Sequence, residues 1–248
     1  MSGTGVGIGP FVAAAVIAVM CAVGGRLFHF RLKHPRRALS IAAGVAVAYV
    51  FIDILPELAA HRLVLIEELG QDILFAEQRI YIIALLGFVL FYGLDYMVLH
   101  AGAGSHEEGG EPAMDYVFWL HVGGFCGYGL LIGYLLPERA GEGALPLALY
   151  TVAMAFHFVL IDHELEHEHG RAYDRLGRWL LVGSILIGCV VGATLHISEL
   201  AVSRLFALVA GGVVITSAQA ELPRDKDGRF GWFVLGAATY ALLLLLAS

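Results

Sequence analysis

Eight long apolar runs, separated by short polar segments, constrain this chain more than any other feature. Each run is close in length to the roughly 20 residues that a helix needs to cross the hydrocarbon core of a bilayer. They cover residues 8–29, 38–56, 79–100, 115–136, 145–162, 178–197, 203–220 and 230–247. With 15% charged residues against 59% hydrophobic ones, the chain has too little charge to cover the surface of a soluble protein. We therefore expect an all-α integral membrane protein in which residues 1–248 form a single transmembrane domain of eight helices.

The positive charges predict how these helices are oriented. If the N-terminus lies outside, eleven of the Lys and Arg residues are cytoplasmic and four are outside, and the opposite orientation inverts this ratio. Because cytoplasmic loops carry the excess of Lys and Arg, we expect a cell (inner) membrane protein with both termini extracytoplasmic. The first run lacks a positive start and is followed by basic residues, so we expect it to remain as a membrane helix.

The second and seventh apolar runs resemble each other. In both, a glycine follows an alanine (Gly44 and Gly211), and a Leu-Pro pair comes at the same distance after it, ending at Pro56 and Pro223. The predicted topology gives the two runs opposite directions, which is typical of inverted repeats in secondary transporters. The first three and last three helices then form two related halves around a central pair. The alternative is a chance similarity between two runs rich in Gly and Ala.

These features resemble the ZIP family of divalent-metal transporters. The second run ends in Asp53-Ile54-Leu55-Pro56-Glu57, similar to the polar residue and Leu-Leu-Pro-Glu of the family's second helix. The seventh run carries Ala210-Gly211 and Glu221-Leu222-Pro223, similar to the family's seventh helix. A short stretch after the third run resembles the family's His-rich loop: His100, His106, Glu107, Glu108 and Glu111. The resemblance implies a 3+2+3 inverted-repeat bundle that transports a divalent metal ion, zinc above all.

The fourth and fifth helices depart from the family pattern. ZIP transporters carry His-Asn-x-Pro-Glu-Gly and His-Glu-x-Pro-Glu-Gly motifs there, and the glutamates bridge metals. This chain keeps a histidine in each place, His121 and His157, but lacks the Pro and Glu of both motifs. We therefore expect a degenerate central site rather than the family's binuclear centre.

His121 and His157 are the candidate ligands of that central site. Counted from the ends of their apolar runs, both lie in the inner half of the membrane at similar depths, so the two imidazoles could share a divalent ion. The alternative is that each makes an interhelical hydrogen bond. A bis-histidine haem is a less favoured reading of the same pair.

The densest group of potential ligands is the run 162–169, with three histidines and four carboxylates. We predict metal binding there, since imidazole and carboxylate together suit zinc and similar ions. The candidate ligands are Asp162, His163, Glu164, Glu166, His167 and His169. Two alternatives remain: a solvated polar helix end, and the His-Glu-x-x-His signature of a zinc metalloprotease, in which Glu164 would activate water.

Polar residues at other helix ends are candidate pathway or gating residues. Asp53 and Glu57 mark the predicted outer end of the second helix, and the inner ends carry Asp95, His100, Gln219 and Glu221. They could equally be ordinary interfacial residues. The sequence thus predicts a metal transporter rather than an enzyme, with a non-transporting metal-binding or sensing protein as the main alternative. The expected partners are the lipid bilayer and the metal ion; a homodimer is compatible with the sequence, and no nucleic acid is expected.

Overall fold

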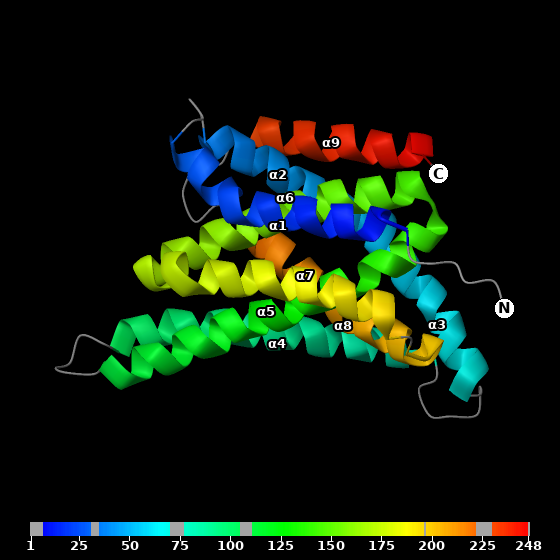
Figure 1. Cartoon of the computed structure of the whole chain (residues 1–248), viewed down its shortest axis with the longest axis horizontal. Coiled ribbons are helices and arrows are strands. Elements are labelled where there is room, and N and C mark those ends of the chain that lie inside the picture. The colour runs from blue at the N-terminus through cyan, green and yellow to red at the C-terminus, as the bar shows by residue number, and fades with distance from the viewer. Residues whose placement is uncertain are drawn as a thin grey trace.

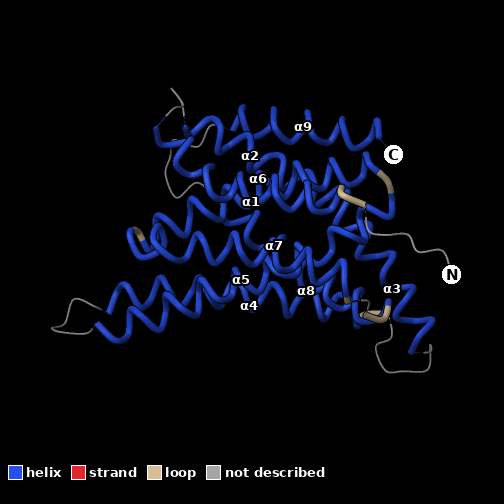
Figure 2. The backbone as a smooth tube through the Cα atoms, in the orientation of Figure 1, coloured by secondary structure: helices blue, strands red, loops and turns tan. Residues whose placement is uncertain are grey.

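The computed structural model describes residues 7–30, 35–69, 77–104, 111–195, 197–221 and 230–247. This part of the chain is almost entirely helical and contains no strand (Figure 2). The helices, in chain order, are α1 (Gly9–Phe30), α2 (Pro35–Tyr49), η1 (Val50–Ile54), α3 (Leu55–Leu69), α4 (Arg79–Gly104), α5 (Glu111–Glu142), α6 (Ala144–His169), η2 (Tyr173–Gly177), α7 (Arg178–Thr194), α8 (Glu199–Glu221) and α9 (Phe230–Ala247).

Six helical stretches within the described residues are long and apolar enough to cross a membrane. They are Arg37–Glu67, Arg79–Met97, Tyr116–Glu142, Ala144–His169, Tyr173–Thr194 and Glu199–Ala218. Two shorter apolar helices, Gly9–Val23 and Phe230–Leu246, accompany them. The predicted all-helical membrane bundle is therefore confirmed at this level.

The helices run back and forth along one axis, so the connecting segments gather at the two ends of the bundle (Figure 1). The start of α1 and the end of α9 lie at the same end. We call this the terminal end, and the opposite one, where α6 ends and α7 begins, the far end.

Four helix pairs make the closest contacts in the bundle: α5 with α7, α1 with α6, α2 with α9, and α4 with α8. Glycines lie where these pairs touch. A Cβ atom on Gly44 of α2 would overlap the backbone of α9 at Phe233, and one on Gly236 of α9 would overlap Ile41 of α2. Backbones approach closely in membrane bundles where glycine removes the side chain between them.

The α4–α8 pair makes the same kind of contact, in which a glycine of each helix faces the backbone of the other. A Cβ atom on Gly211 of α8 would overlap the backbone at Ala84, and one on Gly87 of α4 would overlap Leu208. In both pairs each glycine meets the residue three positions before the partner's glycine. Gly44 and Gly211, which the sequence comparison matched, thus make the same kind of contact with different partner helices.

Two helix boundaries differ most from the sequence prediction. The segment 61–69, expected to be part of a polar gap, is the second half of α3, which follows α2 through the π-helical turn η1. Proline lacks a backbone N–H, and the wider turn just before Pro56 accommodates the missing hydrogen bond without ending the helix. Likewise α6 continues beyond the predicted end at residue 162 as far as His169.

Candidate metal centre

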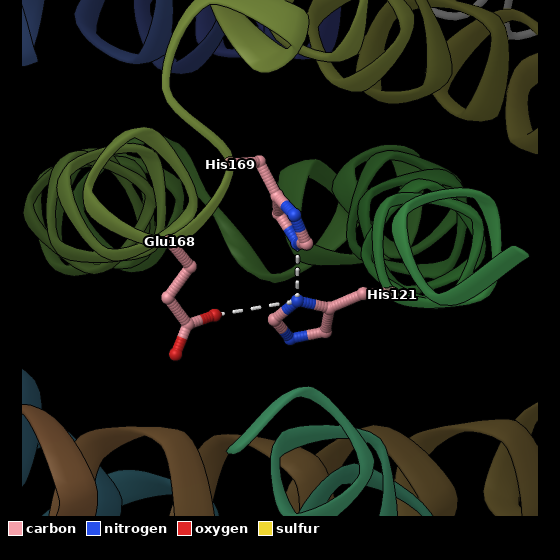
Figure 3. A group of neighbouring side chains, drawn as sticks. All are labelled: His121, Glu168 and His169. Carbon is pink, nitrogen blue, oxygen red and sulfur yellow. Dashed lines mark hydrogen bonds and ion pairs between the residues drawn. The ribbon is translucent and has the colours of Figure 1, made fainter. Parts of the chain in front are cut away.

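Three potential metal ligands meet near the far end of the bundle: His121, Glu168 and His169. His121 lies on α5, and the other two belong to the last turn of α6 and reach toward its ring (Figure 3). The Nδ1 atom of His121 lies 2.9 Å from Nε2 of His169 and 3.4 Å from Oε2 of Glu168. In a tetrahedral zinc site, ligands at about 2.0–2.1 Å from the metal lie roughly 3.3 Å apart, so these separations suit one small ion.

The end of α6 is fixed by Gly170. Its φ of 51° is a left-handed conformation that glycine adopts at little cost, and its N–H donates to the carbonyl of Glu166. The helix therefore stops directly after Glu168 and His169. The carbonyl end of a helix carries partial negative charge, which favours a bound cation there.

A fourth side chain, Asp95 of α4, orients His121 from the other side. Oδ1 of Asp95 lies 3.0 Å from Nε2 of His121, and both side chains are almost completely buried. The carboxylate accepts the Nε2–H hydrogen bond, which leaves the Nδ1 lone pair directed toward Glu168 and His169. Carboxylate–histidine pairs of this kind hold metal-binding imidazoles in the correct tautomer and make them more basic.

The charges in this centre match a divalent ion. Glu168 and Asp95 each contribute one negative charge when ionised, and the two imidazoles bind metal in their neutral form. An unpaired divalent charge in an apolar interior is very costly, and the two carboxylates would compensate the charge of a bound divalent ion. Two histidines and one carboxylate also leave a fourth coordination position for water or an exchanging ligand.

The structure does not bring His157 to this centre. Nε2 of His157 lies 2.9 Å from the hydroxyl of Tyr128, which is seven residues beyond His121 on α5, and 3.4 Å from the hydroxyl of Thr216 on α8. Along α6 it is twelve residues from His169, or about 18 Å at 1.5 Å per residue. The predicted sharing of one ion or haem by His121 and His157 is therefore not observed. The depth estimate failed because α6 extends seven residues beyond its apolar run.

Asp162 and Glu166, two of the predicted ligands, bind an arginine instead. Arg178 of α7 is completely buried and donates from Nε to Oδ1 of Asp162 at 2.7 Å and from Nη2 to Oε2 of Glu166 at 2.8 Å. The hydroxyl of Tyr173 also donates to Asp162, and Asp174 accepts from Nη1 of Arg178. A positively charged guanidinium already neutralises these carboxylates, so they are not free to hold a metal ion.

The other predicted ligands of this run lie outside the centre. His163, Glu164 and His167 do not belong to the one group of His, Cys, Asp and Glu atoms, among the described residues, that is close enough to hold an ion. His167 is exposed, and the two others are partly buried. The His-Glu-x-x-His signature thus forms no three-ligand zinc site here. Glu168, which was not among the predicted ligands, takes part instead.

The predicted pathway residues have four different outcomes. Asp95 joins the metal centre, whereas His100 is exposed and donates from Nδ1 to the carbonyl of Tyr96 at 2.8 Å. Asp53 and Glu57 lie at the terminal end, where both pair with the buried Arg139. The side chains of Gln219 and Glu221 lie outside the part of the chain that the structure describes.

Arg139 of α5 organises a cluster of side chains, which we call the arginine clamp. Its guanidinium pairs with Glu57, with Oδ2 of Asp53 at 3.5 Å and with Oε2 of Glu142 at 3.1 Å. It also lies over the ring of Tyr150, 5.3 Å from the centroid. Asp53 and Arg139 line a cavity of about 180 Å³. Arg139 was not singled out from the sequence, because this residue lies beyond the predicted end of the fourth apolar run at residue 136.

Comparisons with known proteins found no relative that could suggest what this site does. No protein-family model matches the chain, and no curated protein matches its sequence. The case for function therefore depends on the metal centre and the bundle that holds it.

Proposed function

We propose that this protein is a membrane transporter of a divalent transition metal ion, with zinc as the ion that its ligands suit best. The observation that carries the proposal is the group of His121, Glu168 and His169, oriented by Asp95 inside a bundle of apolar helices. Ionisable residues inside membrane bundles are costly and usually mark substrate pathways. An incomplete coordination shell suits transport, because an ion that is to leave again must not be fully enclosed by the protein.

We further propose that the bundle has eight spans in a ZIP-like 3+2+3 inverted repeat, with both termini extracytoplasmic. The four closest helix pairs support the repeat. In the proposed repeat, α1, α2 and α4 correspond to α7, α8 and α9, and α5 corresponds to α6. The α2–α9 pair is then equivalent to the α8–α4 pair. In the same way, the α5–α7 pair is equivalent to the α6–α1 pair. The matched glycine contacts of Gly44 and Gly211 support the same correspondence. The common position of the start of α1 and the end of α9 is compatible with an even number of spans.

In this arrangement the metal centre opens to the cytoplasm and the arginine clamp closes the outer side. Arg139 is only 8% exposed, and its pairing with carboxylates of η1, α3 and α5 joins helices that would have to separate for an ion to enter. The clamp also favours a second candidate function, a non-transporting metal sensor whose centre is reached from one side only. Uptake measurements distinguish the two.

The test is zinc binding and zinc uptake by the purified protein. We expect wild-type protein in detergent to bind zinc, and His121→Ala, Glu168→Gln and His169→Ala each to weaken binding at least tenfold. His167→Ala is the matched control, because this histidine lies two residues from His169 but is exposed. Equal effects of His167→Ala and His169→Ala would refute the assigned centre.

Uptake into proteoliposomes then separates transport from sensing. Zinc entry that the His121→Ala variant loses and the His167→Ala variant keeps supports transport. Zinc binding by the wild type without any uptake of a divalent metal supports the sensor.

A further inference from the structure

The centre of the bundle holds a second ionisable group, His157, in surroundings unlike those of the metal centre. The side chain is 1% exposed and lies between α5, α6 and α8. It is twelve residues from the far end of α6 and thirteen from its start, which places it about halfway through the bundle. A buried histidine at this depth is costly unless the protein uses it.

The hydrogen bonds of His157 involve one ring nitrogen, Nε2. The hydroxyl of Thr216 donates to the carbonyl of Gly212, and the hydroxyl of Tyr128 is available to donate to Nε2 of the histidine at 2.9 Å. In the arrangement in which Tyr128 donates, Nε2 is the acceptor and the proton of the neutral ring is on Nδ1. That Nδ1 atom is buried and has no hydrogen-bond partner among the described residues. An unsatisfied buried N–H is unfavourable, and in native proteins such groups usually bind water or serve a function.

A metal ion does not suit this position. Among the described residues, the polar contacts of the ring are two neutral hydroxyl groups, and no carboxylate is one of them. A divalent ion bound there would be uncompensated in an apolar interior. A proton brings one charge and needs one lone pair, which the imidazole supplies.

Other titratable groups on the helices around α6 contact neighbours other than His157. Asp162 on α6 itself is held by Arg178 of α7. Tyr150 of α6 packs against Tyr49 of α2, which in turn packs against Tyr240 of α9. From α5 and α8, the groups that face the ring are Tyr128 and Thr216.

We propose that His157 is a proton-carrying site and that the protein exchanges protons for the metal ion. This inference rests on the transport function proposed above. A hydronium ion on one side gives its proton to Nε2 when the Tyr128 hydroxyl turns away, forming an N–H bond. The Nδ1–H bond then breaks and the proton passes to a water molecule on the other side, so the ring ends neutral. While His157 carries the extra proton, its positive charge repels a divalent ion from the centre, which makes exchange rather than co-transport the expected outcome.

The test follows zinc and protons together in proteoliposomes with a zinc dye and a pH dye inside. In wild type, zinc entry should make the lumen more alkaline, and a lumen one pH unit more acidic than the outside should support roughly tenfold zinc accumulation for each proton exchanged. His157→Gln keeps an acceptor for Tyr128 but cannot carry a proton, so it should lose both effects. It should keep wild-type zinc binding and zinc-for-zinc self-exchange. His167→Gln, on the same helix but exposed, is the matched control and should behave as wild type.

The outcomes separate the two proposals. Wild-type zinc uptake without any lumenal pH change, or coupling that persists in His157→Gln, overturns the proton role and leaves transport standing. Loss of zinc self-exchange in His157→Gln also overturns it, since the residue is then needed for structure or metal passage. A wild type that takes up no metal refutes the transport function itself.

Discussion

Asp95 allows the sharpest test of how the metal centre works, because it acts on the metal through His121. In Asp95→Asn the side-chain oxygen can still accept the Nε2–H hydrogen bond, but the negative charge is lost. In Asp95→Ala both are lost. The pair of variants therefore separates the orientation of the ring from the charge behind it.

The geometry gives the expected size of the charge effect. Oδ1 of Asp95 lies 3.0 Å from Nε2 of His121. The imidazole ring and one metal–nitrogen bond separate Nε2 from a bound ion, so the carboxylate lies roughly 6–7 Å from that ion. At an effective dielectric constant of about 20, a single and a double charge at this distance attract by about 5 kcal/mol. Part of this is offset by the desolvation of Asp95 itself. Outer-shell partners of metal ligands usually contribute 10- to 100-fold in affinity, and the burial of this pair places it near the upper end.

We therefore expect Asp95→Asn to weaken zinc binding about 100-fold, and Asp95→Ala slightly more. Isothermal titration calorimetry in detergent measures the affinity, and the absorption spectrum of bound cobalt reports the coordination geometry. Glu142→Gln, which removes a partly exposed carboxylate at the terminal end of α5, is the control and should bind zinc as wild type does. Unchanged affinity in Asp95→Asn would show that Asp95 does not support the site, and an equal loss in Glu142→Gln would show a nonspecific charge effect.

Four further results are expected. Zinc affinity should fall as the pH is lowered, because binding requires neutral imidazoles and protons then compete for the same lone pairs; a pH-independent affinity measured between pH 5 and 8 would contradict histidine ligation. Gly211→Val should destabilise the bundle by about 1–3 kcal/mol or more through overlap with the backbone of α4, whereas Gly183→Val, where a Cβ meets nothing within 4 Å, should unfold in detergent as wild type does. Arg178→Gln should cost about 3–5 kcal/mol because it leaves buried carboxylates unpaired, and a thermal unfolding profile identical to wild type would refute the assigned network. Reporter fusions at Ser248 and near Lys226 should lie on opposite sides of the membrane, and finding both on one side would exclude the eight-span topology.

The helical bundle was predictable from sequence because long apolar runs are a direct consequence of the bilayer as solvent. Helix ends were less predictable, since an apolar run marks the hydrocarbon core and not the length of the helix. The segment from His163 to His169 is polar, yet it continues α6 until Gly170 ends it. The sequence therefore indicated His169 as a ligand but misjudged the depth of His157.

The choice of partners among charged residues was the least predictable part. Asp162 and Glu168 stand six residues apart in the same acidic run, and nothing local distinguishes them. One meets Arg178 and the other meets His121. Which of these contacts forms is decided by the packing of α7 and α5 against α6, and these long-range contacts have no signal in a single sequence.

The Arg178 network has a consequence for how the chain enters the membrane during synthesis. Its partners Asp162, Glu166, Tyr173 and Asp174 all precede Arg178 within sixteen residues, on the last turns of α6 and in η2. The guanidinium is therefore surrounded as soon as the α6–α7 hairpin folds, before α8 and α9 have been made. An isolated α7 would present an arginine to lipid at a cost of a few kcal/mol. We expect the two helices to leave the insertion machinery together as a hairpin, and α7 alone to insert poorly when it is separated from its acidic neighbours.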